Sequence, residues 1–133
     1  MRTIKKYKVL FSGRQLWVVK VALEENRPNL KPMVKYVANM HGNEVVGREL
    51  MLGFIEYLAN SYKAGSDPEV SKLLSSMDIH IMPSMNPDGF EISSEGVCRG
   101  TTGRENGNGF DLNRNFPTRD DLDLTNAQLF QNR

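Results

Sequence analysis

Short apolar runs separated by turn residues characterise the first third of the chain. Residues 16–23 and 34–39 are rich in β-branched and aromatic side chains, which is typical of strands. Asparagines and prolines between positions 26 and 32 separate the two runs. We expect the second strand to be buried on both faces. Residues 1–13 are basic and carry no clear pattern, so we expect a frayed lead-in there.

From residue 45 the apolar spacing becomes that of a helix. One face of a helix over residues 45–62 is defined by apolar side chains at positions 46, 50, 54, 57, 58 and 62. A second helix should begin at Pro68, with Asp67 as its cap, and run to about Ser76. Its inward side chains should be Val70, Leu73 and Leu74.

The second half begins with one more strand, over residues 79–83. A turn at residues 86–89 and a polar, glycine-rich loop over 91–108 follow it. Loops of that length in compact domains are often functional. Strand, helix and strand in succession predict an α/β fold, with a mixed, mostly parallel sheet and flanking helices.

Composition limits the class of protein. The 133 residues are enough for one domain, and 17 basic against 16 acidic residues leave a formal net charge of +1. This balance gives no reason to expect nucleic acid as a partner. No apolar run approaches the roughly 20 residues of a transmembrane helix. The basic start lacks the apolar segment of a signal peptide. Cys98 is the single cysteine and cannot form an internal disulfide, and its partner stays open.

A histidine and a glutamate lie three residues apart where the second strand leads into the long helix. His41 and Glu44 offer nitrogen and oxygen ligands that Zn²⁺ accepts in a tetrahedral shell, and Gly42 lets the chain bend between them. A catalytic zinc needs a third protein ligand. His80 is the other histidine, but a position inside a strand favours a packing role. A surface loop with no metal is the alternative for this pair.

Two arginines flank the glycine-rich bend that follows. Arg104 and Arg114 could line one cleft, and Asn113 could add a neutral donor. A guanidinium binds a carboxylate through two parallel hydrogen bonds. The alternative is that these arginines form solvated ion pairs with Glu105, Asp111 or Asp120, which contribute little. The glycines do not match a phosphate-binding loop.

Several of these segments together resemble one family. The residues that carry the resemblance are 39–49 (NMHGNEVVGRE), 82–89 (MPSMNPDG), 103–106 (GREN) and 111–117 (DLNRNFP). In this order they resemble the zinc metallocarboxypeptidases, in particular the regulatory branch with carboxypeptidases N, E, M and D. The resemblance runs from about residue 12 to about residue 118.

The resemblance implies a role for each candidate residue. His41 and Glu44 would be ligands of a Zn²⁺ cofactor, and Arg104 would polarise the scissile carbonyl. Asn113 and Arg114 would hold the substrate's C-terminal carboxylate, so the partners would be peptide or protein C-termini. The reaction would remove the C-terminal residue, with Lys or Arg preferred in this branch.

The chain also departs from the family. The family's third zinc ligand is a histidine beyond the Asn-Arg pair, and its general-base glutamate lies further on, whereas no histidine follows His80. Residues 1–133 are therefore expected to form a partial, truncated catalytic domain with apolar sheet edges exposed. The family is mostly secretory, but no signal peptide is visible, so the location stays open.

Two other functions compete with a carboxypeptidase fragment. One is a non-catalytic peptide- or zinc-binding module that lacks the third ligand and the general base. The other is a hydrolase of small N-acyl amino acids, which the segments at residues 86–89 and 111–116 make the weaker reading.

Overall fold

The computed structural model describes residues 4–8, 13–23, 31–97 and 99–117. Within them, four strands form one sheet in the order β1-β2-β4-β3. β1 (Ile4–Lys8) and β2 (Gln15–Val21) are antiparallel, and β2 is antiparallel to β4 (Asp78–Met82). β3 (Met33–Val37) runs parallel to β4. The sheet is mixed, as predicted, although its parallel share is smaller than we expected.

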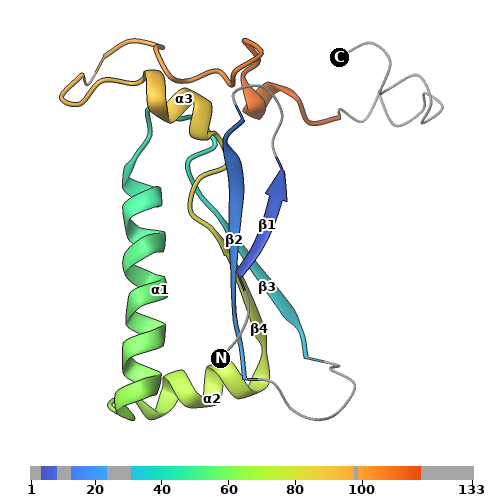
Figure 1. Ribbon diagram of the computed structural model, residues 1–133, viewed down its shortest axis with the longest axis vertical. Helices are drawn as coiled ribbons and strands as arrows, with labels where there is room; N and C mark the ends of the chain where they lie inside the picture. Colours follow the sequence, from blue (N-terminus) through green and yellow to red (C-terminus); the bar gives the residue numbers. More distant parts are fainter. Residues whose placement is uncertain (1–3, 9–12, 24–30, 98, 118–133) are drawn as a thin grey trace.

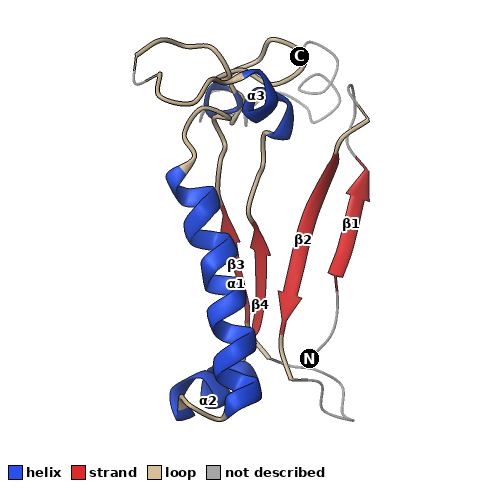
Figure 2. Cartoon of the chain, turned by 60° about the vertical axis from the view of Figure 1, so that its left-hand side comes forward, coloured by secondary structure: helices blue, strands red, loops and turns tan. Residues whose placement is uncertain are grey.

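Helices α1 (Val46–Ala64) and α2 (Pro68–Ser76) connect β3 to β4. Figures 1 and 2 show α1 lying along one face of the sheet, with α2 across its lower end. The core between them consists of buried aliphatic side chains, namely Val21, Leu58, Val70, Leu74, Ile79 and Ile81. Burial of these side chains against the sheet fixes α1 and α2 in place.

Helix α2 agrees with the sequence prediction at both ends. Pro68 is its first residue, and the Asp67 side chain accepts a hydrogen bond from the Glu69 backbone N–H at 3.0 Å. Val70 and Leu74 are buried and Leu73 packs against the core, so the predicted inward face is confirmed. Here the start signal and the apolar spacing lie within nine consecutive residues.

Other expectations were wrong. The lead-in forms a strand at Ile4–Lys8, because it pairs along the length of β2. β3 is exposed rather than buried on both faces, with Met33 66% and Val37 53% accessible, because it is the last strand at one edge of the described sheet. A strand at an edge has a neighbour on one side only.

The apolar face of α1 is also rotated from the predicted one. Leu58 is buried, and Met51, Phe54 and Ile55 pack against the core. Positions 46, 50 and 57 are exposed. The helix packs toward β2 and β4, so the side chains that point away from these strands remain uncovered.

The predicted turn at residues 86–89 is the beginning of a short helix, α3 (Pro87–Ile92), with Asn86 as its cap. Gly89 is needed there for close packing rather than for a turn. A Cβ atom at Gly89 would overlap the backbone oxygens of Gly103 and Glu105. Helix α3 therefore lies in direct backbone contact with the later loop.

Candidate functional site

The predicted site residues gather at one end of the sheet. β3 and β4 run in the same direction, and the loops that leave their carboxyl ends carry residues 38–45 and 83–86. Figure 1 shows these loops, α3 and the later segment around residues 100–117 at the same end of the molecule. In open α/β sheets, ligands bind at this end.

The first loop is held by Asn39. Its side chain is buried, and its Nδ2 donates to the carbonyls of His41 (2.9 Å), Gly42 (3.0 Å) and Glu44 (3.1 Å). Asn39 has a φ of 56°, in the left-handed region that asparagine tolerates better than most residues. The loop therefore wraps around one amide group, which fixes the backbone of both predicted zinc ligands.

His41 and Glu44 point toward each other, as the sequence predicted. His41 Nδ1 lies 3.0 Å from Glu44 Oε1. Two ligand atoms of a tetrahedral zinc, each about 2.1 Å from the metal, lie about 3.4 Å apart. The pair therefore needs to open by only a few tenths of an ångström to hold Zn²⁺, and its donor chemistry fits this metal. His41 is buried, while the Glu44 side chain is 65% exposed.

Asp111 holds the opposite side of the imidazole. Its Oδ1 lies 2.9 Å from His41 Nε2, and its Oδ2 accepts from Arg104 Nε at 2.8 Å. A carboxylate on the second nitrogen of a metal-binding histidine orients the ring and raises its basicity. Because Asp111 faces the other nitrogen, it is not a ligand of the same ion. Among the described residues, no set of three or more His, Cys, Asp or Glu could hold a metal ion.

The electrostatics of Asp111 match this role. Burial raises the pKa of the Asp111 carboxyl. Hydrogen bonds from His41, from the Asn113 backbone N–H and from Arg104, together with the charge of Arg104, outweigh burial and lower this pKa to about 2. Asp111 is therefore ionised at neutral pH and carries the negative charge between the imidazole and the guanidinium.

Arg104 joins the same cluster. Besides its bond to Asp111, its Nη1 lies 3.7 Å from Glu44 Oε1. Arg104 and Asp111 therefore form the ion pair that the sequence analysis gave as an alternative. This pair, however, is partly buried and shared with His41, unlike a solvated surface pair.

Asn113 and Arg114 lie on the short 3-10 helix η1 (Leu112–Arg114), which Asp111 caps by accepting from the Asn113 N–H at 2.9 Å. Both side chains are exposed, and Arg114 Nη1 donates to the Asn113 carbonyl at 3.2 Å. The motif thus turns Asp111 inward and the next residues outward. A shared cleft for Arg104 and Arg114 stays a prediction.

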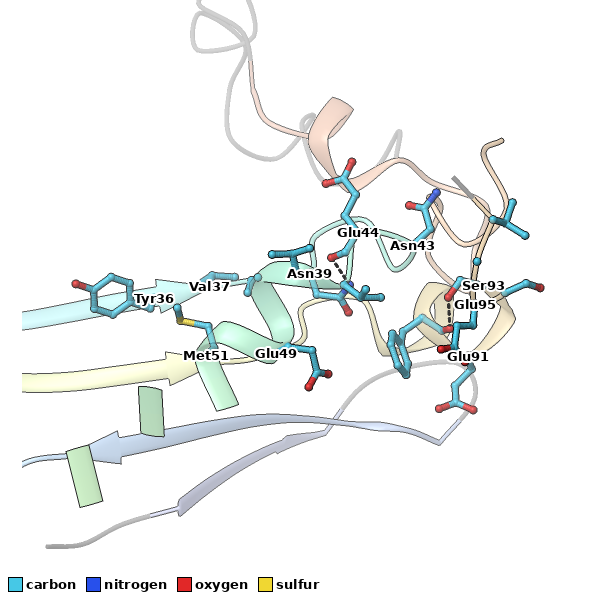
Figure 3. A pocket seen from close by; sticks show the side chains of 18 residues that line it. Tyr36, Val37, Asn39, Asn43, Glu44, Glu49, Met51, Glu91, Ser93 and Glu95 are labelled. Atoms are coloured by element: carbon cyan, nitrogen blue, oxygen red, sulfur yellow. Dashed lines mark hydrogen bonds between the residues drawn. The ribbon is translucent and has the colours of Figure 1, made fainter. Parts of the chain in front are cut away.

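A cavity of about 1130 Å³ lies beside these residues. Figure 3 shows that side chains from the end of β3, from α1 and from the segment after α3 line it, including Val37, Met51 and Glu95. Glu44 is the one predicted site residue in its wall. The cavity adjoins the His41–Glu44 pair rather than enclosing it.

The structure also shows where His80 lies and which of the residues named above fall outside the described part of the chain. His80 lies inside β4, opposite Lys20 and Lys35 of the neighbouring strands, which agrees with a framework role. Cys98 and Asp120 lie outside the described residues. None of the described helices has the length and apolar character of a membrane-spanning segment.

Sequence reasoning missed the residues that hold the site together. Asn39 was not assigned a role, Asp111 was named only as a possible ion-pair partner of the arginines, and Asn86 was read as part of a turn. The available signals were weak, namely an asparagine after a strand and an aspartate two residues before an asparagine. Asp111 bonds to a residue 70 positions away and Asn86 to one 18 positions away, so no local pattern could reveal these two contacts.

Comparison with known proteins gives the wider context. The family model described as "Zinc carboxypeptidase" matches residues 9–132. Carboxypeptidase M of Mus musculus is 56% identical over 107 residues, which cover 79% of this chain and 24% of that protein. Carboxypeptidase D of Anas platyrhynchos is 55% identical over 108 residues, which cover 78% of this chain and 7% of that protein. The chain therefore spans a quarter or less of these relatives.

Two solved structures have a fold similar to that of this chain. A metallo-carboxypeptidase from Burkholderia cenocepacia superposes with a TM-score of 0.66 at 27% identity, covering 84% of this chain and 27% of that one. Thrombin activatable fibrinolysis inhibitor gives a TM-score of 0.64 at 25% identity, covering 87% of this chain and 30% of that one. Both likenesses extend over most of the described fold.

Proposed function

The chain belongs to the zinc carboxypeptidase family, and from this membership we propose that its residues serve the removal of C-terminal residues from peptides and proteins. The observation that carries the proposal is the His41–Glu44 pair, 3.0 Å apart, with Asp111 on the second imidazole nitrogen. The donor chemistry, the spacing and the supporting carboxylate all suit Zn²⁺.

We assign a role to each residue of the cluster. His41 and Glu44 would hold the zinc, which when bound supplies an electrophile that activates water and the scissile carbonyl. Arg104, partly buried beside Glu44, offers donors to the oxygen that becomes negative during attack. Asp111 keeps the imidazole oriented through Nε2. Asn113 and Arg114, exposed on η1, are available to a substrate's C-terminal carboxylate.

We further propose a preference for substrates that end in Lys or Arg. It follows from the chain's similarity to carboxypeptidases M and D, and the described residues contain no acidic side chain that we can assign to such a pocket. We also propose that the activity depends on zinc, because the chain belongs to a zinc-binding family and because His41 and Glu44 offer suitable donor atoms.

A zinc- or peptide-binding module without catalysis is the second candidate. In its favour, His41 and Glu44 supply two ligands where a catalytic zinc typically has three. A metal with two protein ligands stays largely hydrated. For the 133-residue chain we therefore expect weak zinc binding and no peptidase turnover.

The test uses the purified 133-residue chain. Zinc affinity is measured by competition with a chelator, and turnover by release of Arg or Lys from a synthetic peptide. Weak binding that is lost in His41→Ala and kept in His80→Ala, without turnover, is the expected result. Metal-dependent turnover by this chain would refute the expectation of inactivity. Binding that is lost only in His80→Ala would refute the ligand assignment.

A further inference from the structure

Two buried asparagines follow the two parallel strands that carry the site. Asn39 comes after β3 and is 5% exposed, and Asn86 comes after β4 and is 1% exposed. The Asn86 backbone N–H donates to the Asn39 carbonyl at 3.0 Å, so the two residues are directly connected. Buried amides need hydrogen-bond partners, and the partners of these two differ.

Among the described residues, the Asn39 side chain bonds to the first loop and to Ser84. Its Nδ2 binds the carbonyls of His41, Gly42 and Glu44, and its Oδ1 accepts from Ser84 Oγ at 2.7 Å. The backbone on either side of the two proposed zinc ligands is thus tied to one side chain.

The Asn86 side chain serves the other loop. Its Nδ2 donates to the carbonyls of Arg104 (3.2 Å) and Glu105 (3.1 Å), while its Oδ1 accepts from the Gly89 N–H (2.9 Å) and caps α3. Asn86 therefore holds the backbone that carries Arg104, just as Asn39 holds the backbone that carries His41 and Glu44.

Helix α3 approaches both loops closely through backbone atoms. A Cβ atom at Gly42 would overlap the backbone of Gly89 and Phe90, and one at Gly89 would overlap the Gly103 carbonyl. The Asn43 N–H also donates to that carbonyl at 3.2 Å. Backbone contacts thus set the separation of the loops, and they tolerate little displacement.

We infer that Asn39 and Asn86 are positioning residues: Asn39 sets the geometry of the His41–Glu44 pair, Asn86 sets that of Arg104, and the bond between them fixes the two parts relative to each other. This inference rests on the function proposed above for His41, Glu44 and Arg104. That Asn39 and Asn86 hold different loops rests on their hydrogen bonds alone.

Two variants separate the roles. Asn39→Gly keeps a residue that accepts a φ of 56° but removes the amide. Asn86→Asp keeps the oxygen that caps α3 but replaces the donating NH₂ group with an acceptor. Matched controls are Asn108→Gly in an exposed loop and Asn60→Asp on the exposed side of α1.

Amide hydrogen exchange of the metal-free 133-residue chain gives the readout. The Glu44 N–H, bound to the His41 carbonyl, reports on the first loop, and the Arg104 N–H, bound to the Thr101 carbonyl, reports on the second. Amides of β4 report on the whole fold. Asn39→Gly should speed Glu44 exchange roughly tenfold and Asn86→Asp should speed Arg104 exchange by a similar factor, the effect of losing a hydrogen bond or two. In each variant, the reporter amide of the other loop and the amides of β4 should exchange at about the rates measured in the control variants.

A purely structural role predicts another result. If each variant speeds all reporters in parallel, or leaves both loop reporters unchanged, the inference is overturned. Should Asn39→Gly fail to fold, Ser84→Ala, which removes one bond to Asn39, should still speed Glu44 exchange selectively, and a uniform effect would again overturn the inference.

Zinc affinity provides a second measurement. Asn39→Gly should weaken zinc binding about tenfold relative to the parent, since loss of a group that orients metal ligands typically costs 10–100-fold, while Asn108→Gly should not. If the parent binds no zinc, the proposed function fails, and the exchange data still decide the division of roles between the two asparagines.

Discussion

At the scale of single residues, one carboxylate connects most of the site. Asp111 contacts His41, Arg104 and the Asn113 backbone N–H, and these contacts hold its pKa at about 2. Its charge therefore persists over the whole physiological range. Removing that charge should affect the imidazole and the guanidinium together.

The first prediction replaces this residue. Asp111→Asn keeps the shape and one acceptor oxygen but loses the charge, so His41 becomes a weaker and less well oriented ligand. Zinc affinity, measured by chelator competition, should fall about 10- to 100-fold. The control is Glu56→Gln on the exposed side of α1. Equal zinc affinities of Asp111→Asn and the parent would contradict the supporting role.

A second prediction concerns substrate binding, in a longer chain with a complete domain. Arg114 is exposed, and its guanidinium suits a bidentate contact with a carboxylate. Arg114→Lys keeps the charge but loses the fork, so kcat/KM should fall by an amount worth about 1.5–3 kcal/mol.

Peptides with free and amidated C-termini provide the check on Arg114. The parent should discriminate strongly against the amide, and the variant much less. If both enzymes discriminate equally well, Arg114 does not bind the carboxylate.

At the scale of elements, α1 and α2 are joined by a side-chain pair outside the core. The Tyr57 hydroxyl donates to Asp67, the residue that caps α2. This bond raises the pKa of Tyr57 above 10.0 and lowers that of Asp67 below 3.8. The stability from Asp67 is thus present above its ordinary pKa and lost as the pH falls below it. The stability from Tyr57 is present below 10.0 and lost at higher pH.

The third prediction follows from these directions. Tyr57→Phe should lower the Tm at pH 7, where the neutral hydroxyl and the ionised carboxylate both occur. The difference from the parent should shrink as the pH falls below 3.8 and Asp67 becomes protonated. Thermal unfolding at several pH values measures it, with Tyr62→Phe, on the same helix, as control. If the difference in Tm between Tyr57→Phe and the parent does not depend on pH, a charge-assisted hydrogen bond between Tyr57 and Asp67 is excluded.

At the scale of the whole molecule, the described sheet ends in a strand that shows apolar side chains to solvent. Met33, Tyr36 and Val37 of β3 are all exposed, and so are Val46 and Leu50 of the adjacent helix α1. An edge strand with free backbone groups and apolar side chains is a template for pairing with another chain. The expectation of exposed apolar edges is therefore confirmed within the described residues.

The fourth prediction is that the 133-residue chain self-associates through this edge. Met33→Lys places a charge on β3 and should lower the oligomer fraction at a given concentration. Sedimentation velocity over a concentration series measures the effect. Ile92→Lys, at a similarly exposed position on α3 that is not in the cavity wall shared with β3, adds the same charge and should have little effect. If both variants act alike, net charge rather than the β3 edge controls association.

The sequence by itself determined the types of the longer elements and pointed to His41 and Glu44 as the candidate metal pair. The bounds of α2, the strand at Asp78–Met82 and the approach of His41 to Glu44 were all predictable. Each depends on residues at most nine positions apart, so caps, periodicity and ligand spacing are visible in the chain itself. The motifs were also sufficient to identify the family.

Only the tertiary structure decided how these parts combine. It made β3 an edge strand, turned α1 toward β2 and β4, and paired the lead-in with β2. It also brought Asp111 to His41 and Asn86 to the Arg104 loop, across 70 and 18 residues. Such contacts depend on which surfaces meet after the sheet forms. A local pattern therefore cannot specify them, whereas the buried polar groups that they satisfy are what fix the site.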